Sequence, residues 1–141
     1  MLKDRPITIV GAGPVGLTTS LLLSHLKIPH QLIERRLDTV RMPQAHVIRT
    51  RTMEIFRTLG IEQEVYNSRT DMPIENITWK DTISGREIGY LDIHKPGEIL
   101  KTQTACETFV NIPQFDLEPI LLARAQQSPY ADINFGCELL N

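Results

Sequence analysis

The stretch ITIVGAGPVGL, residues 7–17, decides the fold. Its first four residues are apolar and mostly β-branched, which predicts a buried parallel strand. Three glycines follow within six residues. In a strand, turn and helix, Gly11 would permit the sharp turn, Gly13 would let the backbone approach a pyrophosphate, and Gly16 would let the helix pack on its strand. The stretch therefore predicts a nucleotide-binding turn.

The segment after the glycines predicts a helix and then a second strand. Residues 15–26 carry several leucines among small Thr and Ser residues, and Pro29 ends this helix. Residues 30–34 (HQLIE) read as a short strand, so the first 34 residues form a β-α-β unit. The helix N-terminus supplies amide groups and a partial positive charge to phosphates. The predicted phosphate-binding residues are Gly11, Ala12, Gly13, Pro14, Val15 and Gly16.

Glu34, at the end of the second strand, lies eighteen positions after Gly16. This is close to the ~20 residues expected for an acid that binds the ribose hydroxyls of a dinucleotide. A carboxylate would repel a 2′-phosphate, so NADP is disfavoured at this site. NAD and FAD both contain adenosine diphosphate, and the pattern alone does not separate them. The adjacent Arg35 and Arg36 either guide the phosphates or stack near the adenine, or form a solvated charge pair at the end of the strand.

Weaker patterns cover the rest of the chain. Residues 35–47 read as a surface loop, and Gly60 stands where a helix C-terminal cap belongs. The further predictions are a helix over 51–59, helical turns over 61–66, hairpin strands at 77–79 and 88–91 around Ser84-Gly85, a loop over 92–108, a strand at 109–112, a helix over 117–125 with Pro119 in its first turn, and a strand over 132–139.

Composition limits the function classes. The chain has 141 residues, 41% of them hydrophobic and 23% charged, with a net charge of -2, so no basic field favours nucleic acid. The two cysteines lack metal-ligand or disulfide spacing, and the four histidines share no spacing that argues for metal. We find neither a signal peptide nor an apolar run long enough to span a membrane. A cytoplasmic protein with no metal site is the expectation.

The chain resembles the FAD-dependent aromatic hydroxylases, the class A flavoprotein monooxygenases typified by para-hydroxybenzoate hydroxylase. The resemblance rests on ITIVGAGPVGL, LIERR, MPQAHVIRTRTMEIFRTLGI and IPQFDLEPILLARA, and extends to Ala125. It implies an α/β, Rossmann-like FAD-binding domain with a parallel sheet and the start of a second, mixed or antiparallel sheet. The whole chain, 1–141, would be a single FAD-binding domain, with 74–108 an excursion toward a substrate-domain sheet. Because downstream family motifs do not occur before Asn141, we expect a truncated N-terminal part.

The resemblance also implies residue roles. The three glycines would hold the FAD pyrophosphate and Glu34 the adenosine ribose, with Arg35 following the acid as in many members. Gln44 stands where the family has a basic residue near the cofactor, so weaker FAD affinity is expected. Arg51 would partly compensate, or would simply be exposed as the opening residue of a helix. Gln114 would contact the ribityl or pyrophosphate region, with a helix-capping role as the alternative.

The implied reaction uses NAD(P)H and O2 to hydroxylate a small aromatic substrate, with the chemistry supplied by FAD. No catalytic constellation is found in the chain itself. Two alternatives remain open at this point: an NAD-binding dehydrogenase domain, and a non-catalytic nucleotide-binding remnant. Exposed apolar surface left by a missing C-terminal portion would favour a homo-oligomer.

Overall fold

The computed structural model describes residues 7–39, 41–42, 44–70, 76–92 and 109–140. Its elements, in chain order, are β1 (Ile7–Val10), α1 (Pro14–His25), β2 (His30–Glu34), β3 (Val47–Arg49), α2 (Thr50–Thr58), α3 (Glu62–Asn67), β4 (Asn76–Lys80), β5 (Glu87–Asp92), β6 (Phe109–Asn111), α5 (Gln114–Gln126) and β7 (Ala131–Phe135). Most of the predicted elements are therefore present: β1 and β2 have the predicted bounds, and the bounds of the others differ by at most four residues.

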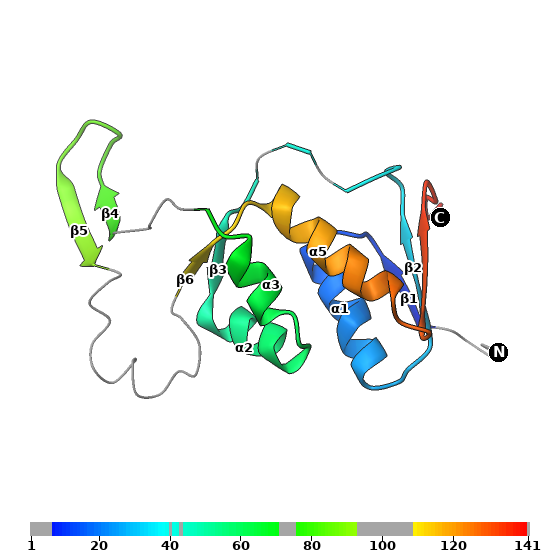
Figure 1. Cartoon of the computed structure of the whole chain (residues 1–141). Helices are drawn as coiled ribbons and strands as arrows, with labels where there is room; N and C mark the ends of the chain where they lie inside the picture. The colour runs from blue at the N-terminus through cyan, green and yellow to red at the C-terminus, as the bar shows by residue number, and fades with distance from the viewer. Residues whose placement is uncertain (1–6, 40, 43, 71–75, 93–108, 141) are drawn as a thin grey trace.

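A parallel sheet in the order β1-β2-β7 organises the part of the chain that contains the glycine turn. Ile9 lies opposite Leu32 across the first strand pair, and Leu32 lies opposite Ile133 across the second. Helices α1 and α5 lie side by side next to this sheet (Figure 1). The β-α-β unit predicted from the first 34 residues is confirmed, and the parallel arrangement brings the carboxyl ends of β1 and β2 to one edge. The burial predicted for β1 is wrong among the described residues: β1 is an edge strand, and Ile7 and Val10 are 45% and 58% exposed.

The core joins the sheet to both helices. Leu32 of β2 is fully buried, as are Leu17 of α1 and Leu121 of α5. Each such leucine stabilises the fold by roughly 1.5–3 kcal/mol relative to an exposed position. The α2 helix adds Met53 and Phe56, both 1% exposed, to the same cluster. The apolar residues of the helix predicted over 51–59 thus pack against the core.

The loop predicted over 35–47 is followed by the strand β3, which begins at Val47. This strand forms a short antiparallel pair with β6. Ile48 of β3 faces Val110 of β6, and both side chains are buried. Two further backbone bonds continue the pairing: the N–H of Ile112 donates to His46 O, and the N–H of Gln114 donates to Ala45 O, both at 2.9 Å. The strand predicted at 109–112 is confirmed as β6, whereas β3 was not predicted, because its three residues follow a loop without a clear pattern and its partner lies some sixty residues away.

Two boundaries near the C-terminus were predicted wrongly. The helix expected over 117–125 begins at Gln114, so Pro119 lies inside α5 rather than in its first turn. Because proline has no N–H, the carbonyl of Phe115 lacks its usual donor there. The strand expected over 132–139 ends at Phe135, because Gly136 adopts a φ of 70° that leaves the extended conformation. Apolar and polar residues continue to alternate as far as Leu139, but residues 136–139 are not part of a strand.

The hairpin of β4 and β5 confirms the two strands predicted around Ser84-Gly85. Its turn is closed by the N–H of Asp81 donating to Arg86 O at 3.1 Å. The loop predicted over 92–108 falls, after Asp92, outside the described residues, as do Cys106 and His94. In the part of the chain that is described, no helix has the length and apolar character needed to cross a membrane.

Candidate functional site

The glycine turn between β1 and α1 has the backbone conformation that the sequence predicts. Gly11 has a φ of 103°, a region that residues with a Cβ rarely adopt, and its N–H donates to Ile33 O at 2.8 Å. A Cβ on Gly16 would overlap the carbonyl oxygen of Gly11 and meet Ile9 Cγ2 at 3.4 Å. Gly11 therefore makes the turn, and Gly16 lets α1 pack against it.

Gly13 is the N-cap of α1 and leaves an open space in front of the helix. Its φ is -76°, and a Cβ there would have only Glu118 Oε1 at 3.9 Å, an ordinary contact. No described side chain caps α1, its first turn carries no acid, and Pro14 occupies the first helical position. The first-turn amide groups of a twelve-residue helix are thus available to an anion.

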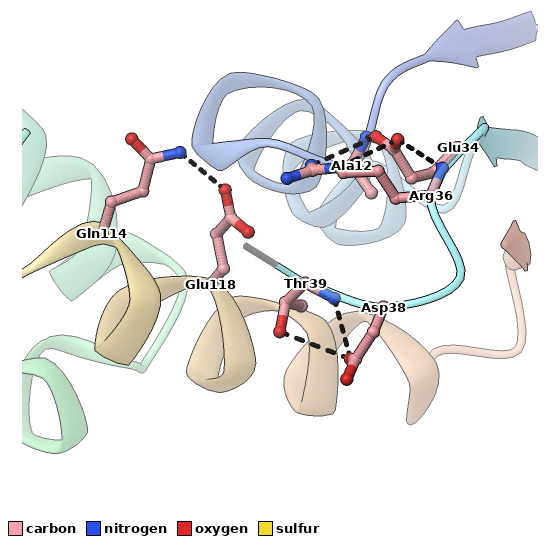
Figure 2. A network of polar contacts seen from close by, with 7 residues as sticks. All are labelled: Ala12, Glu34, Arg36, Asp38, Thr39, Gln114 and Glu118. Carbon is pink, nitrogen blue, oxygen red and sulfur yellow. Dashed lines mark hydrogen bonds and ion pairs between the residues drawn. The ribbon is translucent and has the colours of Figure 1, made fainter. Parts of the chain in front are cut away.

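The carboxylate of Glu34 lies beside this turn and is 7% exposed (Figure 2). Its Oε2 accepts the N–H of Ala12 at 2.8 Å, and its Oε1 accepts the N–H of Arg36 at 2.9 Å. The Arg36 guanidinium donates to the same carboxylate through Nε at 3.1 Å and Nη2 at 3.3 Å. These hydrogen bonds lower the pKa of Glu34 from 4.5 to about 2. The largest contribution comes from the Arg36 side chain. Glu34 is therefore held as an anion.

The two arginines after Glu34 differ in their contacts. Arg36, for which the sequence left a role at the phosphates or adenine and a solvated charge pair open, is the one that binds Glu34. Arg35, the residue predicted for the site, is exposed. It lines a cavity of about 230 Å³ at the carboxyl ends of β1 and β2, together with Val10, Gly11, Ile33, Glu34, Cys137, Glu138 and Leu139. Ligands of open α/β sheets bind at this kind of edge.

Gln114 and Glu118 bring the start of α5 to the same region. The Nε2 of Gln114 donates to Glu118 Oε1 at 2.7 Å (Figure 2). Glu118 is 0% exposed and was missed in the sequence. A signal for it exists: Leu117, Leu121 and Ala125 form the buried face of α5, and Glu118 falls within that face. The capping alternative for Gln114 does not hold, since the N-cap of α5 is Pro113 and no described side chain caps it.

The remaining predicted residues lie differently. Gln44 is exposed in the segment before β3. Arg51 is in the first turn of α2, where its Nη1 donates to Glu54 Oε2 at 2.8 Å and its side chain is 80% exposed. Contacts of either residue with a cofactor stay a prediction. Among the described residues, no group of three or more His, Cys, Asp or Glu side chains could hold a metal ion.

A larger cavity of about 370 Å³ joins the glycine turn to α2 and α5. It includes the predicted residues Pro14, Val15 and Gln114. Its other walls are mostly apolar, and the hydroxyls of Thr18 and Thr19 donate to Pro14 O and Val15 O within α1, so their methyl groups remain to line the space. The cavity suits an apolar group more than a charged one.

Comparison with known proteins gives one family. The model of a family described as "FAD binding domain" matches residues 4–141. A 4-methyl-5-nitrocatechol 5-monooxygenase of Burkholderia sp. is 30% identical over 140 residues, which are 98% of this chain and 25% of that protein. A 2,4-dichlorophenol 6-monooxygenase of Cupriavidus pinatubonensis is 32% identical over 129 residues, which are 86% of this chain and 21% of that protein.

Solved structures agree with these relatives. The flavin-dependent monooxygenase PieE, in complex with FAD and substrate, has a TM-score of 0.74 and 34% identity over 93% of this chain and 23% of its own. Aklavinone-11 hydroxylase, in complex with FAD and aklavinone, has a TM-score of 0.79 and 26% identity over 99% of this chain and 27% of its own. The chain spans about a quarter of the length of the proteins it matches.

Proposed function

This chain belongs to the FAD-binding domain family, and from that premise we propose that it is the N-terminal, FAD-binding part of a monooxygenase that hydroxylates an aromatic compound. The observation that carries the proposal is the uncapped N-terminus of α1, with Gly13 in front of it and the buried Glu34 carboxylate beside it. The names of the relatives, which act on phenols or a nitrocatechol, support the substrate class. The family match favours FAD over the dehydrogenase alternative.

The residues of the site fit the adenosine diphosphate half of FAD. The amides of the turn and of the first turn of α1 would hold the pyrophosphate, because Gly13 leaves no Cβ in the way. Glu34 would accept hydrogen bonds from the ribose hydroxyls. The cavity that Arg35 lines includes the apolar side chains of Val10, Ile33 and Leu139, which suit an adenine ring. The phosphate-binding residues are then Gly11, Ala12, Gly13, Pro14, Val15 and Gly16.

The part of FAD beyond the pyrophosphate would lie toward α5. Two contacts of Gln114 support this role: its amide donates to Glu118, and it borders the larger cavity. Gln44 can donate a hydrogen bond but lacks the charge of the basic residue usual in this family, so we expect modest FAD affinity. Arg51 compensates little, because Glu54 already pairs with it on an exposed face.

When bound, FAD supplies the redox chemistry, with NAD(P)H as reductant and O2 as the oxygen source. The chain's own residues bind and orient it. The domain would comprise residues 1–141, with the 74–108 excursion directed toward a substrate-binding sheet. We propose a cytoplasmic protein with no nucleic-acid partner, which forms a homo-oligomer or associates with a C-terminal portion carrying the substrate contacts.

The reaction is tested with the protein that carries this domain. Supplied with FAD, NADH or NADPH, and a panel of phenols, it is expected to consume NAD(P)H and O2 in equal amounts and to release a hydroxylated phenol, detected by mass spectrometry with 18O2. Without phenol, NAD(P)H oxidation should be slower. Bound flavin with no incorporation of 18O into any phenol of the panel would refute the monooxygenase assignment and leave FAD binding standing.

A further inference from the structure

The Glu34 carboxylate has no acceptor position to spare. It accepts four hydrogen bonds, two from backbone N–H groups, of Ala12 and Arg36, and two from the Arg36 guanidinium. An ionised carboxylate offers about four lone-pair positions. A ribose hydroxyl can therefore bind Glu34 only after one of these donors has left.

The two pairs of donors differ in how easily they can leave. The backbone bonds, at 2.8 and 2.9 Å, are fixed by the chain around β1 and β2. The guanidinium bonds are longer, at 3.1 and 3.3 Å, and the Arg36 side chain is 38% exposed, against 7% for Glu34. Rotation of the arginine side chain into water frees two acceptor positions and leaves the carboxylate oriented by the backbone. The Arg36 guanidinium is therefore the donor that can most easily dissociate from Glu34.

We propose that Arg36 occupies the place of the adenosine ribose in the free protein, and that the two ribose hydroxyls replace its two guanidinium donors on Glu34 when the nucleotide binds. The exchange keeps the number of hydrogen bonds on the carboxylate constant. It rests on the proposed function, because it requires a ligand with an adenosine diphosphate half. Arg36 is thus a competitor of the ribose, whereas a positioning residue would support its binding.

Two carboxylates attract the Arg36 guanidinium in the free protein. The hydrogen bond with Glu34 raises the pKa of Arg36, and the charge of Glu118 acts in the same direction. The groups that face the guanidinium are therefore the carboxylate of β2 and the buried carboxylate of α5. The contact that must be broken is an ion pair with a half-exposed cation, which is weak. Its removal is expected to tighten FAD binding by about two- to fivefold.

The substitution Arg36→Met tests the exchange, since it removes the guanidinium and keeps a flexible apolar stem. Wild-type and variant chains are titrated with FAD and with inorganic pyrophosphate, which has the phosphates proposed for the glycine turn and no ribose. We expect the Kd for FAD to fall by about two- to fivefold relative to the Kd for pyrophosphate. Arg86→Met, in the exposed turn between β4 and β5, makes the same change in net charge and should leave the ratio unaltered.

The outcomes separate this proposal from the proposed function. An unchanged ratio, or weaker FAD binding by Arg36→Met, would overturn the exchange while FAD binding by the wild type stands. A wild-type chain that binds neither FAD nor ADP would overturn both.

A second measurement needs no variant. In the 15N-labelled wild type, the Arg36 Nε–H signal should move from an ion-paired to a solvent-exposed chemical shift as ADP is added. A signal that stays at its ion-paired position at saturating ADP would show that Arg36 does not leave Glu34.

Discussion

At the scale of single residues, the Glu34 carboxylate has an observed structural role as well as the binding role that we propose. It links the glycine turn, through Ala12, to the segment after β2, through Arg36. The same oxygens are the acceptors that the nucleotide would use. The stability of the turn and the affinity for the nucleotide should therefore both depend on this one side chain.

The depressed pKa of Glu34 predicts a pH-dependent contribution to stability. Since the pKa is about 2 in the folded protein and 4.5 for an unperturbed glutamate, the contribution is complete above about pH 5 and is lost as the pH falls toward 2. The shift corresponds to roughly 3 kcal/mol, and solvent screening of the half-exposed Arg36 reduces our expectation to about 1–2 kcal/mol. Urea unfolding of wild type and Glu34→Gln at pH 7 should differ by that amount.

The matched control for this prediction is Glu87→Gln, an exposed carboxylate of β5. It makes the same change in net charge away from the glycine turn. The difference between wild type and Glu34→Gln should shrink steadily between pH 5 and pH 2, while the difference for Glu87→Gln stays small. A difference for Glu34→Gln that is constant over this range would show that the carboxylate does not stabilise the fold through its charge.

Residue identities were predictable from sequence to different degrees. Spacing from the glycines was enough to single out Glu34, because the length of a β-α-β unit fixes where the second strand ends. The choice between Arg35 and Arg36 was not predictable, because it depends on the direction the chain takes after β2. The burial of Glu118 was hinted at by its place on the apolar face of α5, but its neighbour Gly13 is over a hundred residues away.

At the scale of elements, two glycines in the connection of β1 to α1 have different roles. Gly16 is needed for packing, and Gly13 is proposed to be needed for binding. Gly16→Ala would force a Cβ into the carbonyl oxygen of Gly11, so it should lower the free energy of unfolding by about 1–3 kcal/mol. Gly13→Ala meets only Glu118 Oε1 at 3.9 Å and has an allowed φ, so the fold should tolerate it. Its Cβ would instead obstruct the pyrophosphate.

This pair is tested by thermal unfolding and FAD titration of both variants. Gly13→Ala should keep the wild-type Tm and lose FAD affinity by at least about tenfold, equivalent to about 1.4 kcal/mol. Gly16→Ala should lose several degrees in Tm. Wild-type FAD affinity in Gly13→Ala would contradict the assignment of the pyrophosphate to this turn, and an unchanged Tm in Gly16→Ala would contradict the close packing.

The elements were predictable where local pattern and packing agree. The β-branched run of β1 and the alternation at the start of β7 both became strands of the parallel sheet. The sequence pattern predicted the elements wrongly where a distant partner or a backbone conformation determines whether an element forms or where it begins and ends. β3 exists because β6 pairs with it, Gly136 ends β7 early, and α5 begins at Gln114 because the backbone there is tied to Ala45.

At the scale of the whole molecule, the described residues would form one half of the proposed cofactor site. The glycine turn, Glu34 and the start of α5 come from segments spread over more than a hundred positions. The parallel sheet brings the first two to one edge, and α5 brings Glu118 close to Gly13. The chain spans about a quarter of the length of its relatives. Recognition of the adenosine diphosphate half is therefore the central claim for this part of the protein.

The most direct test of that claim is a fluorescence titration of the flavin-free chain with FAD, followed by competition with ADP and a parallel titration with NAD. We predict that FAD binds with a stoichiometry of one and more tightly than NAD, and that excess ADP displaces it. A chain that does not bind FAD, or bound FAD that saturating ADP fails to displace, would contradict the claim.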